Sequence, residues 1–299
     1  MFHVEQPMKK FEKCPVTDTE LHPYISCVDE TVSKKTFQID ANESESILVT
    51  NPRPSLEDLG SYYESDAYIS HTDSAKGFVD RIYQAVKKYA LVQKRKLVST
   101  HIPDKSLLDI GCGTGDFLLE LKRNGWKVSG MEPNSGARAK AEQKLSASLF
   151  SNPDLSEIND GSWEGLSMWH VLEHVPDPNE TVSQLWRILK KGGIAIIAVP
   201  NFKSWDAKHY KKHWAAFDVP RHLFHFSQGG MKDLFLKNGF SHLETKPMIF
   251  DSFYVSLLSE KYKSGRSNLF SAFWSGLRSN RAARRNGEYS SLIYVFKKQ

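Results

Sequence analysis

The sequence has few cysteines and no long apolar run, and both features limit what the protein can be. Cys14, Cys27 and Cys112 are an odd and sparse set in 299 residues, which argues against a disulfide framework and is typical of a reducing compartment. No stretch approaches the roughly 18 apolar residues that cross a bilayer, and the N-terminus has no apolar signal region. We therefore expect a cytoplasmic protein without a membrane partner.

Charge is nearly balanced along the chain, with 40 basic and 35 acidic residues and a net charge of +5. The basic excess gathers toward the C-terminus. Such a cluster could face nucleic acid or an acidic substrate, although a solvated helix face is the simpler interpretation, so nucleic acid is the less favoured partner. The cluster comprises Lys261, Lys263, Arg266, Arg278, Arg281, Arg284, Arg285, Lys297 and Lys298.

Three segments follow one another in the chain. Residues 1–55 hold short apolar runs, TFQI and SILVT, which indicate a small β-rich or irregular unit. Residues 56–100 begin with a turn-rich, tyrosine-dense stretch that could cover a ligand, and continue as an amphipathic helix. Residues 101–299 form the third segment. The helix in 56–100 is predicted from the apolar spacing of Phe78, Ile82, Val86, Tyr89 and Leu97.

From Ser106 onward, strand and helix patterns alternate, which is typical of a parallel sheet covered by helices on both faces. Asn134 or Ser135, Asp177 and Ser227 are suited to begin the helices. The sequence therefore predicts a doubly wound α/β domain from about residue 100 to the C-terminus. Strands are expected at 106–112, 126–132, 146–150, 166–172, 193–201, 242–249 and 290–298, with helices at 116–125, 134–145, 181–191 and 230–239.

A glycine-rich turn follows the first of these strands, in the run LLDIGCGTGDFL. Asp109, Gly111, Gly113 and Gly115 give the spacing D-x-G-x-G-x-G, one residue tighter than the dinucleotide-binding turn G-x-G-x-x-G. Glycine leaves room for a ligand at the start of the following helix. An acidic first residue repels phosphate and pairs with an ammonium group, and Glu132 at the tip of the next strand can accept from a ribose diol. The pattern favours S-adenosylmethionine as the ligand.

These motifs resemble those of the class I S-adenosylmethionine-dependent methyltransferases over roughly residues 60 to 299. LLDIGCGTGDFL, GMEPN, WHVLEHVPDP and LKKGGIAIIAVPN occur in the family's order, and AFDVPRHLFHFS is similar to the ubiquinone-biosynthesis O-methyltransferase branch. The resemblance implies a Rossmann-like seven-stranded sheet of order 3-2-1-4-5-7-6, with the last strand antiparallel. It implies cofactor contacts from Asp109, Gly111, Cys112, Gly113, Gly115, Met131, Glu132, Pro133, His170 and Tyr63.

The chain departs from the family pattern at two places. Trp163-Glu164-Gly165-Leu166 replaces the usual acidic opening of the fourth strand, and the adenine contact is left open between Asn152 and Asp154. The N-terminal run CPVTDTELHPYISC resembles a degenerate Cys-rich ribbon. A structural zinc needs about four ligands, and Cys14 and Cys27 with His3 and His22 are a poor set, so no metal is expected.

Methyl transfer requires alignment and exclusion of water, and a base only where the acceptor must lose a proton. The candidate catalytic residues are His170, His174, Asp218 and His222. His174 could equally be a hydrogen-bonded histidine at a strand–helix junction. The run from Trp214 to His225 sets aromatic rings beside an acid, an arginine and two histidines, and is the expected acceptor pocket. Asp218 could equally form a loop-fixing ion pair with Arg221, with the aromatic residues around it in the core.

The favoured function is methyl transfer from S-adenosylmethionine to a small-molecule acceptor, with oxygen as the favoured acceptor atom. Two alternatives stay open. The basic C-terminal cluster suggests an RNA-directed or macromolecule-directed methyltransferase, and the weak fourth-strand opening suggests an inactive cofactor-binding scaffold. The expected assembly is a monomer or a homodimer.

Overall fold

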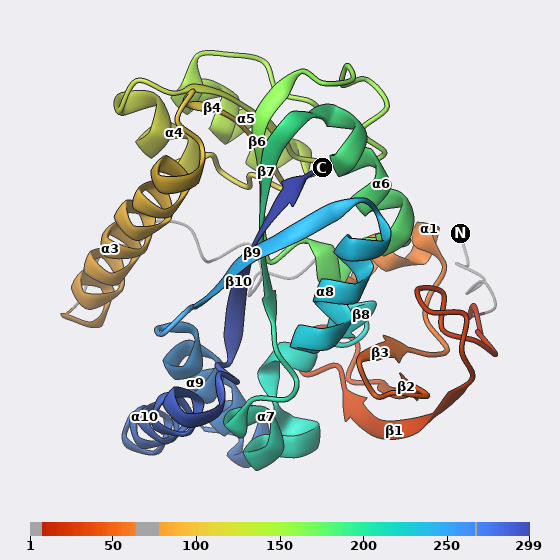
Figure 1. Ribbon diagram of the computed structural model, residues 1–299. Coiled ribbons are helices and arrows are strands. Elements are labelled where there is room, and N and C mark those ends of the chain that lie inside the picture. Colours follow the sequence, from red (N-terminus) through yellow and green to blue (C-terminus); the bar gives the residue numbers. More distant parts are fainter. Residues whose placement is uncertain (1–7, 64–77, 267) are drawn as a thin grey trace, which may run out of the picture.

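The computed structural model describes residues 8–63, 78–266 and 268–299, with the side chains of 78–83 left aside. Figure 1 shows a central sheet flanked by helices, with a small second sheet against one end of it. Among the described helices, none is long and apolar enough to cross a membrane.

The central sheet has six strands in the order β5-β4-β6-β7-β10-β9. β4, β5, β6 and β7 run parallel, and β10 lies antiparallel to both β7 and β9. The doubly wound α/β prediction and the antiparallel last strand are confirmed. The strands are β4 (Ser106–Ile110), β5 (Lys127–Met131), β6 (Trp163–Trp169), β7 (Leu189–Pro200), β9 (Phe240–Pro247) and β10 (Ser291–Lys298).

The seventh strand, expected at 146–150, does not form. Phe150 makes a single parallel bridge to Met131, and its N–H and C=O bond Gly130 and Glu132. The N–H of Leu149, which points away from β5, donates to the side chain of Glu142, and no further bridge joins residues 146–149 to β5 in the described part of the chain. The observed order is therefore the expected one without its first strand.

Alternation along β7 explains how helices cover both faces. Ala195, Ile197 and Val199 pack into one apolar cluster with α6 (Pro178–Ile188) and α8 (Gln228–Lys237). The residues between them, including Ile196, pack into another with α3 (Phe78–His101), α4 (Asp116–Arg123) and α5 (Ser135–Leu145). A strand buried on both faces needs no polar side.

Helix starts follow the predicted caps. The side chains of Asn134, Asp177 and Ser227 each accept a backbone N–H at the start of α5, α6 and α8. Tyr89, on the predicted apolar face of α3, is 52% exposed and packs edge-on against Phe250.

A second sheet holds β1 (Leu21–Val28), β2 (Thr36–Asn42), β3 (Ile47–Thr50) and β8 (Phe224–Phe226). The strand β8 comes from the C-terminal half of the chain and pairs with β3. Cys14 and Cys27 are free thiols buried in two different apolar clusters, and His22 is exposed beside Glu45. His3 lies outside the described residues.

The remaining described helices are short, except for a pair between β9 and β10. This pair, α9 (Asp251–Ser264) and α10 (Leu269–Asn286), forms a helical hairpin at the lower left of Figure 1. A helix face was expected in this basic region, but not two helices. The short elements are α1 (Leu56–Leu59), η1 (Gly60–Tyr63), η2 (Leu172–His174), α7 (Trp205–Tyr210), η3 (Lys211–His213) and η4 (Ala215–Phe217).

Candidate functional site

The glycine turn lies between β4 and α4, and all three of its glycines have positive φ. The φ values are +71° at Gly111, +54° at Gly113 and +77° at Gly115, a region that side chains with a Cβ seldom adopt. Gly115 begins α4 in the left-handed conformation. The sequence can therefore make this turn only with glycine at these positions.

Each glycine meets different surroundings. A Cβ at Gly111 would lie 2.5 Å from a methyl group of Val171, and one at Gly115 would lie 2.9 Å from Ala141. A Cβ at Gly113 would point into open space. Gly111 and Gly115 thus serve close packing, whereas Gly113 leaves the turn accessible to a ligand. The Gly111 contact also places the turn directly against the segment between His170 and His174.

Glu132 connects the turn to the end of β5. It is 9% exposed, and its two carboxylate oxygens accept from the N–H groups of Gly113, at 2.8 Å, and Asn134, at 2.9 Å. Each carboxylate oxygen has a second lone pair, so both can still accept from a ligand. The carboxylate is thus held in place with spare acceptor capacity.

Asp109 is 2% exposed at the end of β4, and Ser167 of β6 donates to it at 2.5 Å. Burial raises the pKa of Asp109 to about 7, against the hydrogen bond from Ser167 and the nearby charge of Lys94. A nearby ammonium group would stabilise the ionised carboxylate. Glu132 therefore fits the ribose diol of S-adenosylmethionine, and Asp109 fits its ammonium group. The negative charge of these residues excludes a phosphate from the turn.

The neighbouring candidates have mainly structural contacts. The carbonyl of Met131 accepts from the N–H groups of Gly111 and Cys112, and Met131 is buried. The Cys112 thiol is buried against Gly130, and burial raises its pKa far above the ordinary value, which excludes a reactive thiolate. Pro133 is exposed beside Glu132.

His170 follows β6 with a φ of +57°. Its Nε2 lies 3.0 Å from Asp251 of α9, and its Nδ1 lies 3.3 Å from Glu173. Burial lowers the pKa of His170, but the hydrogen bonds to Asp251 and Glu173 outweigh it and raise the pKa to about 10. A protonated ring cannot accept a proton, so this geometry favours a positioning role over the predicted catalytic one.

His174 and His222 lie with their ring centroids 4.5 Å apart, edge to face. His174 Nδ1 lies 3.1 Å from the carbonyl of Arg221 and 3.0 Å from the hydroxyl of Tyr63, and His222 Nδ1 lies 2.9 Å from the carbonyl of Ala216. A carbonyl oxygen only accepts, so Nδ1 carries the proton in each neutral ring. Both Nε2 atoms then hold a lone pair that can take up a proton.

The electrostatics keep His174 neutral. Burial and the nearby ring of His222 lower the pKa of His174 to about 4, and the same causes hold the pKa of His225 well below its usual value. Glu173, His174 and His222 each direct one ligand atom to a common region, all within 4.8 Å of one another, so this group could hold a metal ion.

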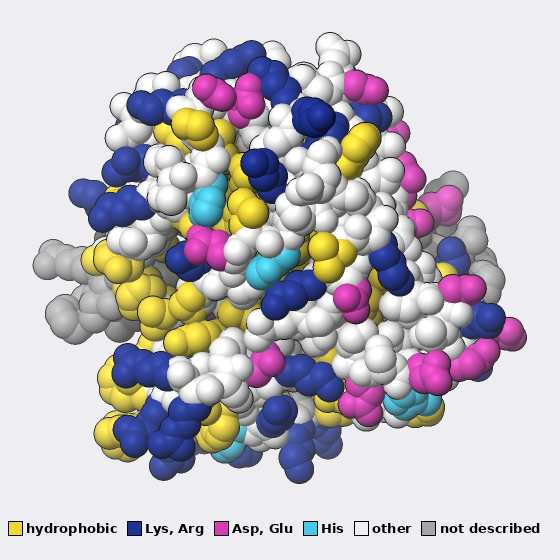
Figure 2. Space-filling model, in the orientation of Figure 1, with side chains coloured by type: hydrophobic (Ala, Val, Ile, Leu, Met, Phe, Trp, Pro, Cys, Tyr) yellow, Lys and Arg dark blue, Asp and Glu magenta, His cyan; other side chains and the backbone are white. Residues whose placement is uncertain are grey.

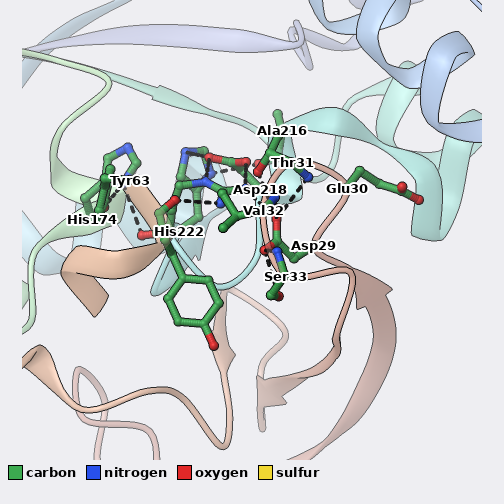
Figure 3. Close-up of polar contacts among 12 residues, drawn as sticks. Asp29, Glu30, Thr31, Val32, Ser33, Tyr63, His174, Ala216, Asp218 and His222 are labelled. Carbon is green, nitrogen blue, oxygen red and sulfur yellow. Dashed lines mark hydrogen bonds and ion pairs between the residues drawn. The ribbon is translucent and has the colours of Figure 1, made fainter. Parts of the chain in front are cut away.

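Asp218 forms the ion pair that the sequence analysis gives as the alternative to catalysis. Arg221 is 1% exposed and bonds both oxygens of Asp218, at 2.6 and 3.0 Å, and Asp29 at 3.1 Å. Figure 3 places Asp218 between His222 and the turn that starts at Asp29. Burial raises the pKa of Asp29, but hydrogen bonds from Ser33 and the Arg221 charge hold it well below its usual range.

The aromatic residues predicted to wall the acceptor pocket belong to the core. Trp214 is 2% and Phe217 3% exposed, in the apolar cluster under the second sheet. A cavity of about 300 Å³ lies elsewhere, between that sheet and α8, and its described lining contains none of the candidate residues. Tyr62 and Tyr63 lie in η1, and Tyr68 falls outside the described residues.

Several residues of the site were missed by sequence reasoning. Asp29, Ser167 and Asp251 each bond a predicted residue from a different part of the chain. Glu173 is 1% exposed within the recognised WHVLEH run and was given no role. Of these residues, only Ser167 could have been predicted. The expected sheet order sets β6 beside β4, and Ser167 lies directly opposite Asp109 on these two parallel strands.

Comparison with known proteins places the fold. A methyltransferase from Thermotoga maritima, described as S-adenosylmethionine-dependent, superposes with a TM-score of 0.51 at 22% identity, over 74% of this chain and 97% of its own. Magnesium protoporphyrin IX methyltransferase from Synechocystis, with bound S-adenosylmethionine, gives 0.51 at 14% identity, over 82% and 99%. At these identities the likeness is one of fold.

Relatives by sequence match about a third of the chain. A ubiquinone biosynthesis O-methyltransferase from Nitrosococcus oceani is 35% identical over 104 residues, 32% of this chain and 44% of its own length. The chain thus spans about half the length of the curated relatives that it matches. The family described as methyltransferase domain matches residues 79–245, more than half of the chain. The chain therefore belongs to this family, the class I S-adenosylmethionine-dependent methyltransferases.

Proposed function

We propose that this protein transfers the methyl group of S-adenosylmethionine to an oxygen atom of a small-molecule acceptor. The observation that carries the proposal is the direct contact between the glycine turn and the histidine segment, through Gly111 and Val171. The contact puts groups suited to a methyl donor beside groups suited to an acceptor hydroxyl. The cytoplasmic location, the assembly as a monomer or homodimer, and the domain boundaries stay predictions.

At the donor end, Glu132 would accept from the ribose diol and Asp109 would face the ammonium group. The open direction at Gly113 gives the cofactor room against the backbone. Bound S-adenosylmethionine supplies an electrophilic methyl group on a good leaving group, so the protein's share of the work is alignment and exclusion of water. The roles of Gly113, Asp109 and Glu132 are binding and orientation.

At the acceptor end, His174 or His222 would take the hydroxyl proton at Nε2. The carbonyl contacts of both Nδ1 atoms fix the tautomer that leaves Nε2 ready. The relatives named as ubiquinone biosynthesis O-methyltransferases support oxygen as the acceptor atom. Asp218, through Arg221, would position the loop that carries His222 and make no contact with the substrate.

The test separates the two ends. Calorimetric titration with S-adenosylhomocysteine should show micromolar binding, and Glu132→Ala should weaken it at least about tenfold, equal to about 1.4 kcal/mol. His174→Gln and His222→Gln should leave that affinity intact. Turnover is measured with a set of phenolic acceptors, by the release of S-adenosylhomocysteine. At least one of the two histidine variants should lower turnover by about 100-fold or more.

His209→Gln is the matched control, because His209 is an exposed histidine of α7 stacked on Trp205. NAD is the control ligand. Absence of S-adenosylhomocysteine binding by the folded wild type would overturn the enzyme assignment. Equal loss of affinity and turnover in both histidine variants would overturn the acceptor-end roles.

A further inference from the structure

Large apolar side chains gather on the outward face of α10. Phe270 is 74%, Phe273 53% and Trp274 48% exposed, and Leu269 and Leu277 are exposed beside them. Exposed Phe and Trp side chains grouped on one helix are unusual on a protein surface and mark an interaction site. Figure 2 shows apolar and basic side chains side by side at this corner, at the lower left.

The same helix face continues as a basic surface. Phe270, Trp274 and Leu277 are followed at helical spacing by Arg281 and Arg284, so the five share one side of α10. The opposite side, made of small residues, packs inward. Its buried members are Ala272, Ser275, Gly276, Ser279, Asn280 and Ala283.

The hairpin of residues 249–287 carries the charge excess of the protein. It holds seven basic and two acidic residues, so its net charge of +5 equals that of the whole chain. Glu260 is buried and accepts from Tyr210, and Asp251 pairs with His170. Within the described part of the chain, no acidic side chain forms an ion pair with the exposed arginines of α10.

We propose that this hairpin docks the protein on the surface of an anionic phospholipid bilayer. A helix that presents aromatic and leucine side chains beside arginines lies in the headgroup region, with its apolar face in the acyl boundary and its charges on the anionic lipids. The lack of a long apolar run excludes a spanning helix but not this arrangement, which departs from the expectation of no membrane partner.

Two other occupants fit the observations less well. A second copy would place the same patch against itself, and a net charge of +5 on each side would repel. Single-stranded nucleic acid is bound in a basic groove with bases stacked on rings. Here the rings are exposed on the surface of α10 together with Leu269 and Leu277.

The hairpin also reaches the candidate site. Ile249 and Phe250, just before α9, and Tyr254, in its first turn, are exposed apolar side chains, and Phe250 packs on Tyr89 of α3. Asp251 follows directly and holds His170. A docked hairpin therefore brings the bilayer to the edge of the donor and acceptor groups.

Co-sedimentation of the full chain with vesicles tests the proposal. Vesicles of equal parts phosphatidylglycerol and phosphatidylcholine should bind it at least about tenfold more tightly than phosphatidylcholine alone, which is about 1.4 kcal/mol. The double variants F270S/W274S and R281E/R284E should each remove most of that difference. Leu236→Ser and Arg123→Glu are matched controls, exposed on α8 and α4, and should bind as the wild type does.

Unchanged S-adenosylhomocysteine affinity would show that each variant is folded. Equal binding to both vesicle types, no binding, or equal losses in the control variants would overturn the proposal. The proposal would also be overturned if F270S/W274S kept its vesicle binding but lost a concentration-dependent dimer, or RNA binding, that the wild type shows. The vesicle measurement needs no methyl transfer, so its failure and the failure of the proposed function are separate results.

Discussion

The donor end of the site takes its polar groups from one short run, Asp109 to Glu132, whereas the acceptor end takes them from four segments between Asp29 and His222. At the donor end, backbone N–H groups and glycines form most of the surface. At the acceptor end, the buried Arg221 bonds Asp218, three residues before it, and Asp29, 192 positions away. The comparison suggests that substitutions at the donor end change affinity, and that those at the acceptor end change the stability of the fold.

Replacing Arg221 with methionine tests the second half of that statement and should have the largest effect. Removing the guanidinium leaves the buried Asp29 and the half-buried Asp218 without their cation, so the free energy of unfolding should fall by about 3–5 kcal/mol. Denaturant unfolding measures it. Lys190→Met, which breaks an exposed pair with Glu164, is the control and should change the free energy of unfolding far less. Equal effects would show that the buried network does not support the acceptor end.

Acid should weaken the acceptor end through His174. Burial and His222 lower the pKa of this residue to about 4, whereas the unfolded chain takes up the proton near pH 6.5. The stability due to neutral His174 is present above pH 6.5 and is lost as the pH falls toward 4. The stability advantage of wild type over His174→Asn should therefore shrink by about 2 kcal/mol between pH 7 and pH 5, measured by denaturant unfolding. A constant difference would mean that the ring titrates normally.

Gly113→Ala should have the smallest effect on stability. Nothing lies where its Cβ would go, so the cost is that of a left-handed alanine, about 1 kcal/mol. Calorimetry should nevertheless show a clear loss of S-adenosylhomocysteine affinity, because the methyl group fills the open side of the turn. Gly125→Ala is the matched control, with positive φ and open space but no part in the site. Equal affinity in both variants would remove Gly113 from the donor end.

The donor end was predictable from the sequence to a greater extent than the acceptor end. The glycine turn, Glu132 and the helix caps were predictable because each depends on residues near in sequence. The role of Asp29 was not predictable, because its partner Arg221 lies 192 positions away. The residues next to each of them in the sequence do not indicate that the two form a pair. The strand predicted at 146–150 was wrong, because only Phe150 pairs with β5.

The acceptor pocket shows a third limit. A run of aromatic residues beside an acid and histidines looks the same whether it lines a cavity or fills a core, and here Trp214 and Phe217 fill a core. Only packing against β2 and α9 decides between the two, and those partners come from opposite ends of the chain. His174 and His222 meet for the same reason, through contacts that neither sequence neighbourhood encodes.

The pairing of β3 with β8 bears on how the protein is made on the ribosome. Residues 47–50 are synthesised early, but their partner strand at 224–226 emerges only after most of the methyltransferase domain. During that interval the buried strand β3 is an open edge with apolar side chains, the kind of edge that pairs with other chains. Slower translation between the two strands should therefore lengthen the period in which nascent chains can aggregate, and the N-terminal sheet reaches its final form late although it is made first.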